Sequence, residues 1–282
     1  MEKRPEVAGF SGPSRLHVPS FPSYVMKVLR AIEHLGELYA AAQIFSEVSA
    51  YSLHGKTDPD TGEKVLKIRL ASQPPITFGT LAADCVHSLR QSLDHLAYKL
   101  AVSISGSDPP PNEATAGFPI HNSSAGFKGN LAAKIGDPDK IPRPILKTLN
   151  ELQPYNSWEG KQLAILRDLD NRAKHRELPI CVGVVRPTET AVEGDSVVLK
   201  SLRTGPVEEG ETEIARFEVS KPNVQVEVRG WLSIEIVFGS DSPAEGQSVV
   251  KYLQTVRAML LRKVMPSLMP EDFRVNDPIP GG

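Results

Sequence analysis

Cysteine is scarce in this sequence, and other features that mark whole classes of protein are missing. Cys85 and Cys181 are too few for a disulfide framework or a zinc cluster, so we expect buried structural thiols. No apolar run approaches the roughly 18 residues that a membrane span needs. The N-terminal Met-Glu-Lys-Arg-Pro also lacks the apolar segment of a signal peptide. These absences predict a cytoplasmic protein without membrane contact.

A strong charge of one sign is also missing. The net charge is −2 and the pI is near 6.4, which gives no global nucleic-acid footprint. Locally the balance differs: residues 127–177 hold ten Lys/Arg and seven Asp/Glu (10 − 7 = +3), and residues 187–241 hold five and eleven (5 − 11 = −6). The first segment could form a basic surface, or it could consist of ordinary solvated helix faces.

The spacing of apolar residues changes along the chain and predicts an α+β fold. We expect a helical bundle core with an N-terminal β-hairpin, followed by a C-terminal antiparallel β-meander closed by a final helix. Helical spacing predicts helices over about 23–48, 78–102, 127–135, 144–152, 158–177 and 244–264. Strands are predicted over 51–54 and 65–70 in the hairpin, and over 180–185, 196–202, 213–219, 224–228 and 231–238 in the meander.

These elements predict a domain organisation in four parts. Residues 1–22 are rich in Pro, Ser and Gly and are expected to form a disordered arm. Residues 23–178 form the helical core with the hairpin inserted in it. Residues 179–265 form the sheet and the final helix that packs on the core, and 266–282 form an irregular tail. Trp158 and Trp231 are expected to be core or sheet-packing residues.

The helix predicted over 78–102 carries most of the hydrogen-bonding side chains that draw attention. At roughly 100° per residue, one stripe opposite the leucine face holds His87, Gln91, Asp94 and Tyr98, with Arg90 and His95 at its margins. The stripe could be a solvated face on which Arg90 and Asp94 form a salt bridge. It could instead face a cleft in which His87 or His95 moves protons and Arg90 stabilises an anion.

Arg90, four intervening residues and His95 within a helical core resemble the Arg-x4-6-His signature of HEPN domains. The resemblance implies a metal-independent endoribonuclease of the toxin or defence type. In that case Arg90 would hold the phosphate and His95 would act as general acid or base on the ribose 2′-hydroxyl. Five helical positions separate the two by roughly 140°, so the pair would act across a homodimer interface or at a helical kink.

A second cluster lies at the end of the helix predicted over 158–177. Arg172, Lys174, His175 and Arg176, four potentially cationic side chains in five residues, could be favoured there by the negative end of the helix dipole. They could instead bind a phosphate, with Asn171 and His175, one turn apart, directed at the helix of His87. Together with the His-x-x-Arg-x-x-x-Asp-His run, this Lys-His-Arg sequence also resembles uncharacterised bacterial proteins, which imply no activity.

The remaining patterns leave two functional hypotheses. Cofactor-dependent and acyl-transfer chemistry have no support, because the chain has neither a Gly-rich phosphate loop nor a Gly-x-Ser-x-Gly motif. His87, Asp94, Asp170 and His175 are acceptable metal ligands, but their spacing matches no metal motif, so no metal is expected. The first hypothesis is the HEPN-like endoribonuclease, with RNA or another phosphate-containing ligand as its partner. The second is a non-catalytic ligand-binding or protein-interaction module.

Overall fold

The protein is described by a computed structural model that covers residues 21–48, 51–185, 197–220 and 233–273. The strand predicted over 224–228 and Trp231 lie outside them, as do positions 1–20 of the predicted arm and 274–282 of the predicted tail.

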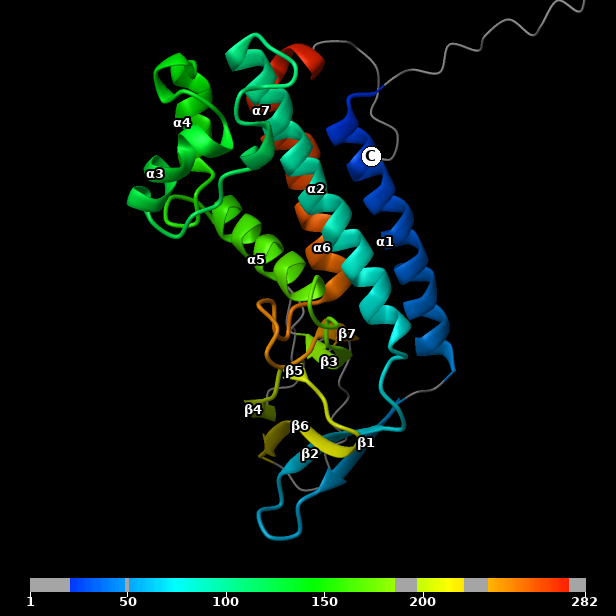
Figure 1. Ribbon diagram of the computed structural model, residues 1–282. Coiled ribbons are helices and arrows are strands. Elements are labelled where there is room, and N and C mark those ends of the chain that lie inside the picture. The colour runs from blue at the N-terminus through cyan, green and yellow to red at the C-terminus, as the bar shows by residue number, and fades with distance from the viewer. Residues whose placement is uncertain (1–20, 49–50, 186–196, 221–232, 274–282) are drawn as a thin grey trace, which may run out of the picture.

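Helices make up one half of the molecule (Figure 1). The two longest, α1 (Ser23–Glu47) and α2 (Thr77–Ser105), lie side by side, and α5 (Trp158–Ala173) and α6 (Val249–Met259) pack on α2. A π-helical turn, η3 (Leu260–Val264), joins α6 to α7 (Met265–Leu268). Two short helices, α3 (Ser124–Lys134) and α4 (Arg143–Glu151), complete this half. None of the described helices is both long and apolar enough to cross a membrane.

The leucine face predicted for α2 is buried in the helical core. Leu89, Leu93 and Leu96 have no exposed surface, because positions three and four apart fall on one side of a helix. The helix ends before Gly106, whose φ of 72° is the left-handed conformation typical of a helix C-terminus. α2 is therefore the central element against which α1, α5 and α6 are positioned.

The strands form two antiparallel sheets. One has the order β1 (Tyr51–Thr57), β2 (Lys64–Leu70), β6 (Gly210–Val219), β4 (Val197–Leu202). The other has the order β5 (Gly205–Pro206), β3 (Ile180–Val185), β7 (Ser233–Phe238). The predicted meander is thus divided between two sheets, and the predicted hairpin is extended by it, since Val65 pairs with Arg216 and Ile68 with Thr212.

A small second core explains this pairing. Ile68 and Leu70 of β2 are buried with Val182 and Val184 of β3, and Val207 and Ile214 complete the cluster. A two-stranded hairpin alone would be marginally stable in water, and adding β6 to β2 gives it a buried face.

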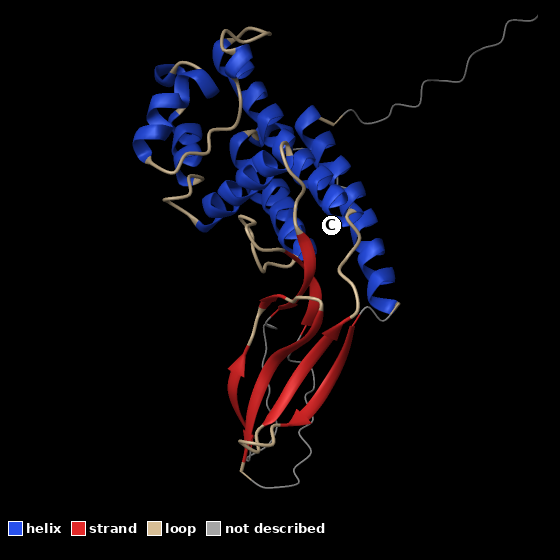
Figure 2. Ribbon diagram, turned by 60° about the horizontal axis from the view of Figure 1, so that its bottom comes forward, coloured by secondary structure: helices blue, strands red, loops and turns tan. Residues whose placement is uncertain are grey.

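The strand β7 connects the two halves of the molecule, which Figure 2 shows as helices and strands at opposite ends. Ile236 and Phe238 of β7 belong to the helical core, while Val182 of β3, the partner of Ile236 in the sheet, belongs to the small core. The α+β class and the layout of bundle and hairpin are confirmed, and the predicted domain boundaries stay predictions.

Candidate functional site

The polar stripe of α2 meets the end of α5 at a buried carboxylate. Asp170, on the last turn of α5, is 1% exposed. Its Oδ1 lies 2.9 Å from Nδ1 of His87, and its Oδ2 lies 2.6 Å from Nζ of Lys174. A buried carboxylate is stable only when it is paired and hydrogen-bonded. These contacts therefore tie α2 to α5.

The other ring nitrogen of His87 is also bonded, because its Nε2 lies 2.7 Å from the amide nitrogen of Gln91. Nδ1–H can then donate to Asp170 while Nε2 accepts from Gln91. We expected Asn171 and His175 to face α2, but the residue of this cluster that contacts α2 is Asp170, which also binds Lys174. Asn171, His175 and Arg176 are exposed, and their side chains make no hydrogen bond or ion pair within the described part of the chain.

Arg90 and Asp94 hold the loop that follows α2. Nη2 of Arg90 lies 2.9 Å from Oδ1 of Asp94 and donates to the carbonyl of Phe118 at 3.3 Å. The same carboxylate oxygen accepts the N–H of Phe118 at 3.0 Å. The guanidinium is mostly buried, and its Nη1 has no partner among the described residues. The salt bridge considered from the sequence is therefore present, and it also binds a backbone segment.

His95 and Tyr98 have different surroundings from Arg90. Partial burial, with Lys27 of α1 nearby, lowers the pKa of His95. The Tyr98 hydroxyl donates to Oδ1 of Asp108 at 2.9 Å, beyond the end of α2. Arg90 thus binds the Phe118 loop, whereas His95 lies near α1. No described contact brings the Arg90–His95 pair together.

Compared with models of known families, with curated proteins and with solved structures, the chain shows no match. Within the described ranges, no three His, Cys, Asp or Glu side chains are grouped where they could hold a metal ion.

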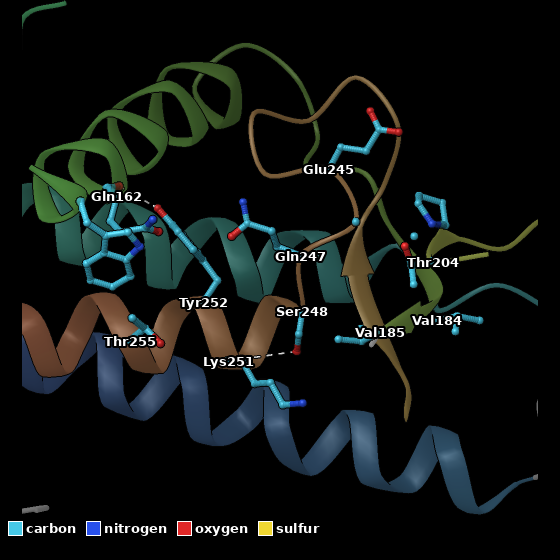
Figure 3. A pocket seen from close by; sticks show the side chains of 14 residues that line it. Gln162, Val184, Val185, Thr204, Glu245, Gln247, Ser248, Lys251, Tyr252 and Thr255 are labelled. Carbon is cyan, nitrogen blue, oxygen red and sulfur yellow. Dashed lines mark hydrogen bonds between the residues drawn. The ribbon is translucent and has the colours of Figure 1, made fainter. Parts of the chain in front are cut away.

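A cavity lies where helices and strands meet, away from the α2 stripe. It has a volume of about 770 Å³, and we call it the junction pocket (Figure 3). The start of α5, one face of α6, the loop before α6 and the edge formed by β3 and β5 surround it. Its lining consists of Trp158, Gln162, Val184, Val185, Thr204, Gly205, Pro206, Glu245, Gly246, Gln247, Ser248, Lys251, Tyr252 and Thr255.

Several polar side chains of the junction pocket have no hydrogen-bond partner among the described residues. Gln162, Thr204, Glu245 and Gln247 make no side-chain hydrogen bond to any residue that the structure describes. Figure 3 shows Gln162, Gln247 and Thr204 spread across the pocket, from the α5 side to the strand edge. Amide and hydroxyl groups in such positions can donate to and accept from a bound molecule.

One wall of the junction pocket is held in place by the contacts of Tyr252. The Tyr252 hydroxyl donates to the carbonyl of Gln162 at 3.0 Å, and its ring packs edge-to-face on Phe238 with 5.8 Å between centroids. Burial raises the pKa of Tyr252 well above its usual value, so the phenol stays a neutral donor. This contact joins α5 to α6 and leaves the side chain of Gln162 free.

The prediction that Trp158 packs in a core or on a sheet is wrong, because this side chain is 54% exposed and lines the junction pocket. It stands at the first position of α5, directly after the N-cap Ser157, whose hydroxyl accepts from Gly160 at 3.0 Å. The buried leucines of this helix are Leu163, Leu166 and Leu169.

The one cation in the described lining of the junction pocket is neutralised. Lys251 binds the carboxylate of Glu235, which also accepts from the hydroxyl of Ser233 at 2.6 Å. Burial raises the pKa of Glu235, but these hydrogen bonds lower it by more and keep it below its usual value. Glu245 contributes the free carboxylate of the lining, so the junction pocket offers polar groups without net positive charge.

Proposed function

We propose that the protein is a non-catalytic ligand-binding module whose site is the junction pocket. One observation carries the proposal: four polar side chains of this pocket, those of Gln162, Thr204, Glu245 and Gln247, have no partner among the described residues, whereas His87, Arg90, Gln91 and Asp94 of the α2 stripe are bonded within the fold. A side chain that already bonds the backbone or a buried carboxylate is a structural element. A free amide at a concave surface gains a partner when a ligand binds.

The lining supports an uncharged ligand with hydroxyl or amide groups. Gln162, Gln247 and Thr204 offer both donors and acceptors, and the exposed indole of Trp158 offers a flat apolar surface. The free carboxylate of Glu245 and the neutralised Lys251 disfavour a phosphate. A volume of about 770 Å³ accommodates a molecule of the size of a sugar or a nucleoside.

The composition of the junction pocket supports binding over catalysis. Its described lining contains neither histidine nor cysteine, the side chains that most often move protons or act as nucleophiles near neutral pH. On the α2 stripe, the guanidinium of Arg90 is bound to Asp94 and Phe118. No contact among the described residues favours the endoribonuclease hypothesis, which stays a prediction.

Saturation-transfer NMR with N-acetylglucosamine, glucose, adenosine and uridine tests the proposal. At least one compound is expected to receive saturation from the protein. The signal should be lost in the double variant Gln162→Ala/Gln247→Ala, which removes two free amides and no described side-chain hydrogen bond.

The matched control is Gln254→Ala, an exposed glutamine of α6 that does not line the junction pocket. Its signal should equal that of the unchanged protein. The proposal would be rejected if none of the four compounds bound, or if the double variant bound them as well as the control did.

A further inference from the structure

A separate hollow of about 520 Å³ lies between α3 and α4. In Figure 1 these two helices lie side by side, on the other side of α2 from α1 and far from the sheets. Each helix contributes residues at positions i, i+3, i+4 and i+7, which fall on one face. These are Ser124, Phe127, Lys128 and Leu131 of α3, and Arg143, Leu146, Lys147 and Asn150 of α4; Pro138 completes the lining.

The charge of this α3–α4 groove is positive. Lys128, Arg143 and Lys147 line it, and no aspartate or glutamate does. Lys128 and Arg143 form no ion pair with any residue in the described ranges. Lys147 lies 3.7 Å from Glu151, and both side chains are well exposed, so this pair is weak. Elsewhere Lys174, Lys251 and Arg216 bind carboxylates closely; in the groove, two of the three cations have no carboxylate partner among the described residues.

Neutral donors add to these cations. Asn150 Oδ1 accepts from the Tyr155 hydroxyl at 3.2 Å, which leaves the amide NH2 group of Asn150 to donate. Ser124 and Arg143 are the first residues of α3 and α4. Because Asn150 in the last turn of α4 also lines the groove, the helix dipoles do not add to the positive charge, which comes from the three side chains.

The base of the groove is apolar. Phe127 and Leu131 are buried, and Leu146 is half-buried against the same core. A ligand of matching chemistry carries a strong anion at one end and an apolar body at the other.

We propose that the α3–α4 groove binds a small phosphorylated compound with an apolar or aromatic body. A phosphate monoester carries nearly two negative charges and three acceptor oxygens, which suit one guanidinium and two ammonium groups better than a single carboxylate does. The cations are confined to one hollow in a protein of net charge −2, whereas nucleic acid is bound by an extended row of them. This proposal is independent of the function of the junction pocket.

Isothermal titration with phenyl phosphate, inorganic phosphate, benzoate and phenol tests the inference. Phenyl phosphate is expected to bind most tightly, followed by inorganic phosphate and benzoate, and phenol is expected to show no binding. In Lys128→Gln/Arg143→Gln, the Kd of phenyl phosphate should rise about tenfold or more, since two charge-assisted hydrogen bonds are lost. The variant should fold normally, because neither side chain makes a described hydrogen bond or ion pair.

The matched control is Lys161→Gln/Arg262→Gln, which removes the same charge at two exposed positions outside the groove. Its Kd should change less than about twofold, as expected for distant screened charges. Equal weakening in both double variants, or no binding of phenyl phosphate, would overturn the inference. The inference would also be overturned if a single-stranded RNA bound more tightly than phenyl phosphate and its binding depended on Lys161 and Arg262. That result would indicate an extended nucleic-acid surface.

Discussion

The buried carboxylate of Asp170 allows a quantitative test of the structural role of the α2 stripe. Its two partners, His87 and Lys174, are 47% and 49% exposed, while the Asp170 side chain is 2% exposed. Replacing either partner by alanine should cost about 1 kcal/mol, because the remaining partner still bonds the carboxylate and water screens the lost one.

Replacing both partners should cost much more than the sum of the two single changes. The double variant His87→Ala/Lys174→Ala leaves a buried charge without a partner, a change worth about 4 kcal/mol. The coupling between the two positions is then about 2 kcal/mol (4 − 1 − 1), as in double-mutant cycles of contacting residues. Adding Asp170→Asn removes the stranded charge and should recover about half of the loss.

Urea unfolding at pH 7 measures these free energies. An equivalent cycle at Lys147 and Glu151, which are 77% and 59% exposed, is the control and should give a coupling below about 0.5 kcal/mol. Additive effects at His87 and Lys174, or no recovery with Asp170→Asn, would show that Asp170 is not both buried and charged. His87 would then not stabilise the fold through Asp170.

Four further predictions concern single residues. Purified protein with a chelator should leave single-stranded RNA intact on a gel, because the guanidinium of Arg90 is bound within the fold; cleavage that Arg90→Ala abolished would support an endoribonuclease. Gln153→Ala should lower the free energy of unfolding by about 3 kcal/mol in urea, since this buried amide bonds three backbone groups; a loss below about 1 kcal/mol would contradict this packing. Burial raises the pKa of Cys85 to about 12, so stability should fall as the pH rises above the usual thiol value of 9.0, where the unfolded thiol ionises first; alkylation of Cys85 in the native protein as fast as a free thiol, followed by mass spectrometry, would refute its burial. Burial lowers the pKa of His95, so the contribution of the neutral imidazole to stability is complete above pH 6.5 and is lost as the pH falls through the lower pKa of the folded state. His95→Gln should therefore reduce the pH dependence of the urea midpoint between about pH 7 and 5. An unchanged pH dependence in this variant would contradict the burial of His95.

Much of the fold could be predicted from residue spacing. The apolar positions of α2 recur every three or four residues, and Leu89, Leu93 and Leu96 are fully buried. Alternating β-branched residues likewise predicted the strands that become β3 and β7. The pairing of β2 with β6 was not predictable, because the partners lie far apart in the sequence and many registers bury the same residues.

For the candidate site, residue spacing predicted which side chains form the stripe on α2, but not which atoms they contact. It placed His87 and Gln91 on one helix face, and their side chains are indeed bonded to each other. The final contact with α5 depends on the rotation of that helix about its axis. A rotation of one position, roughly 100°, decides whether Asp170 or Asn171 faces His87.

The junction pocket was missed for a physical reason. One signal was available: Trp158 and Gln162 are one turn apart on α5, and Lys251, Tyr252 and Thr255 lie along one side of α6. Thr204 and Gln247, however, belong to loops whose position no local pattern encodes.

Local spacing by itself determined the helices, most strands and the α+β class, since burying an apolar face is a property of each element alone. Tertiary packing decided which polar groups are bonded and which are free, because a hydrogen bond requires two atoms within about 3 Å of each other. His87 and Arg90 therefore became part of the scaffold, while Trp158, Gln162 and Gln247 became a surface that can bind.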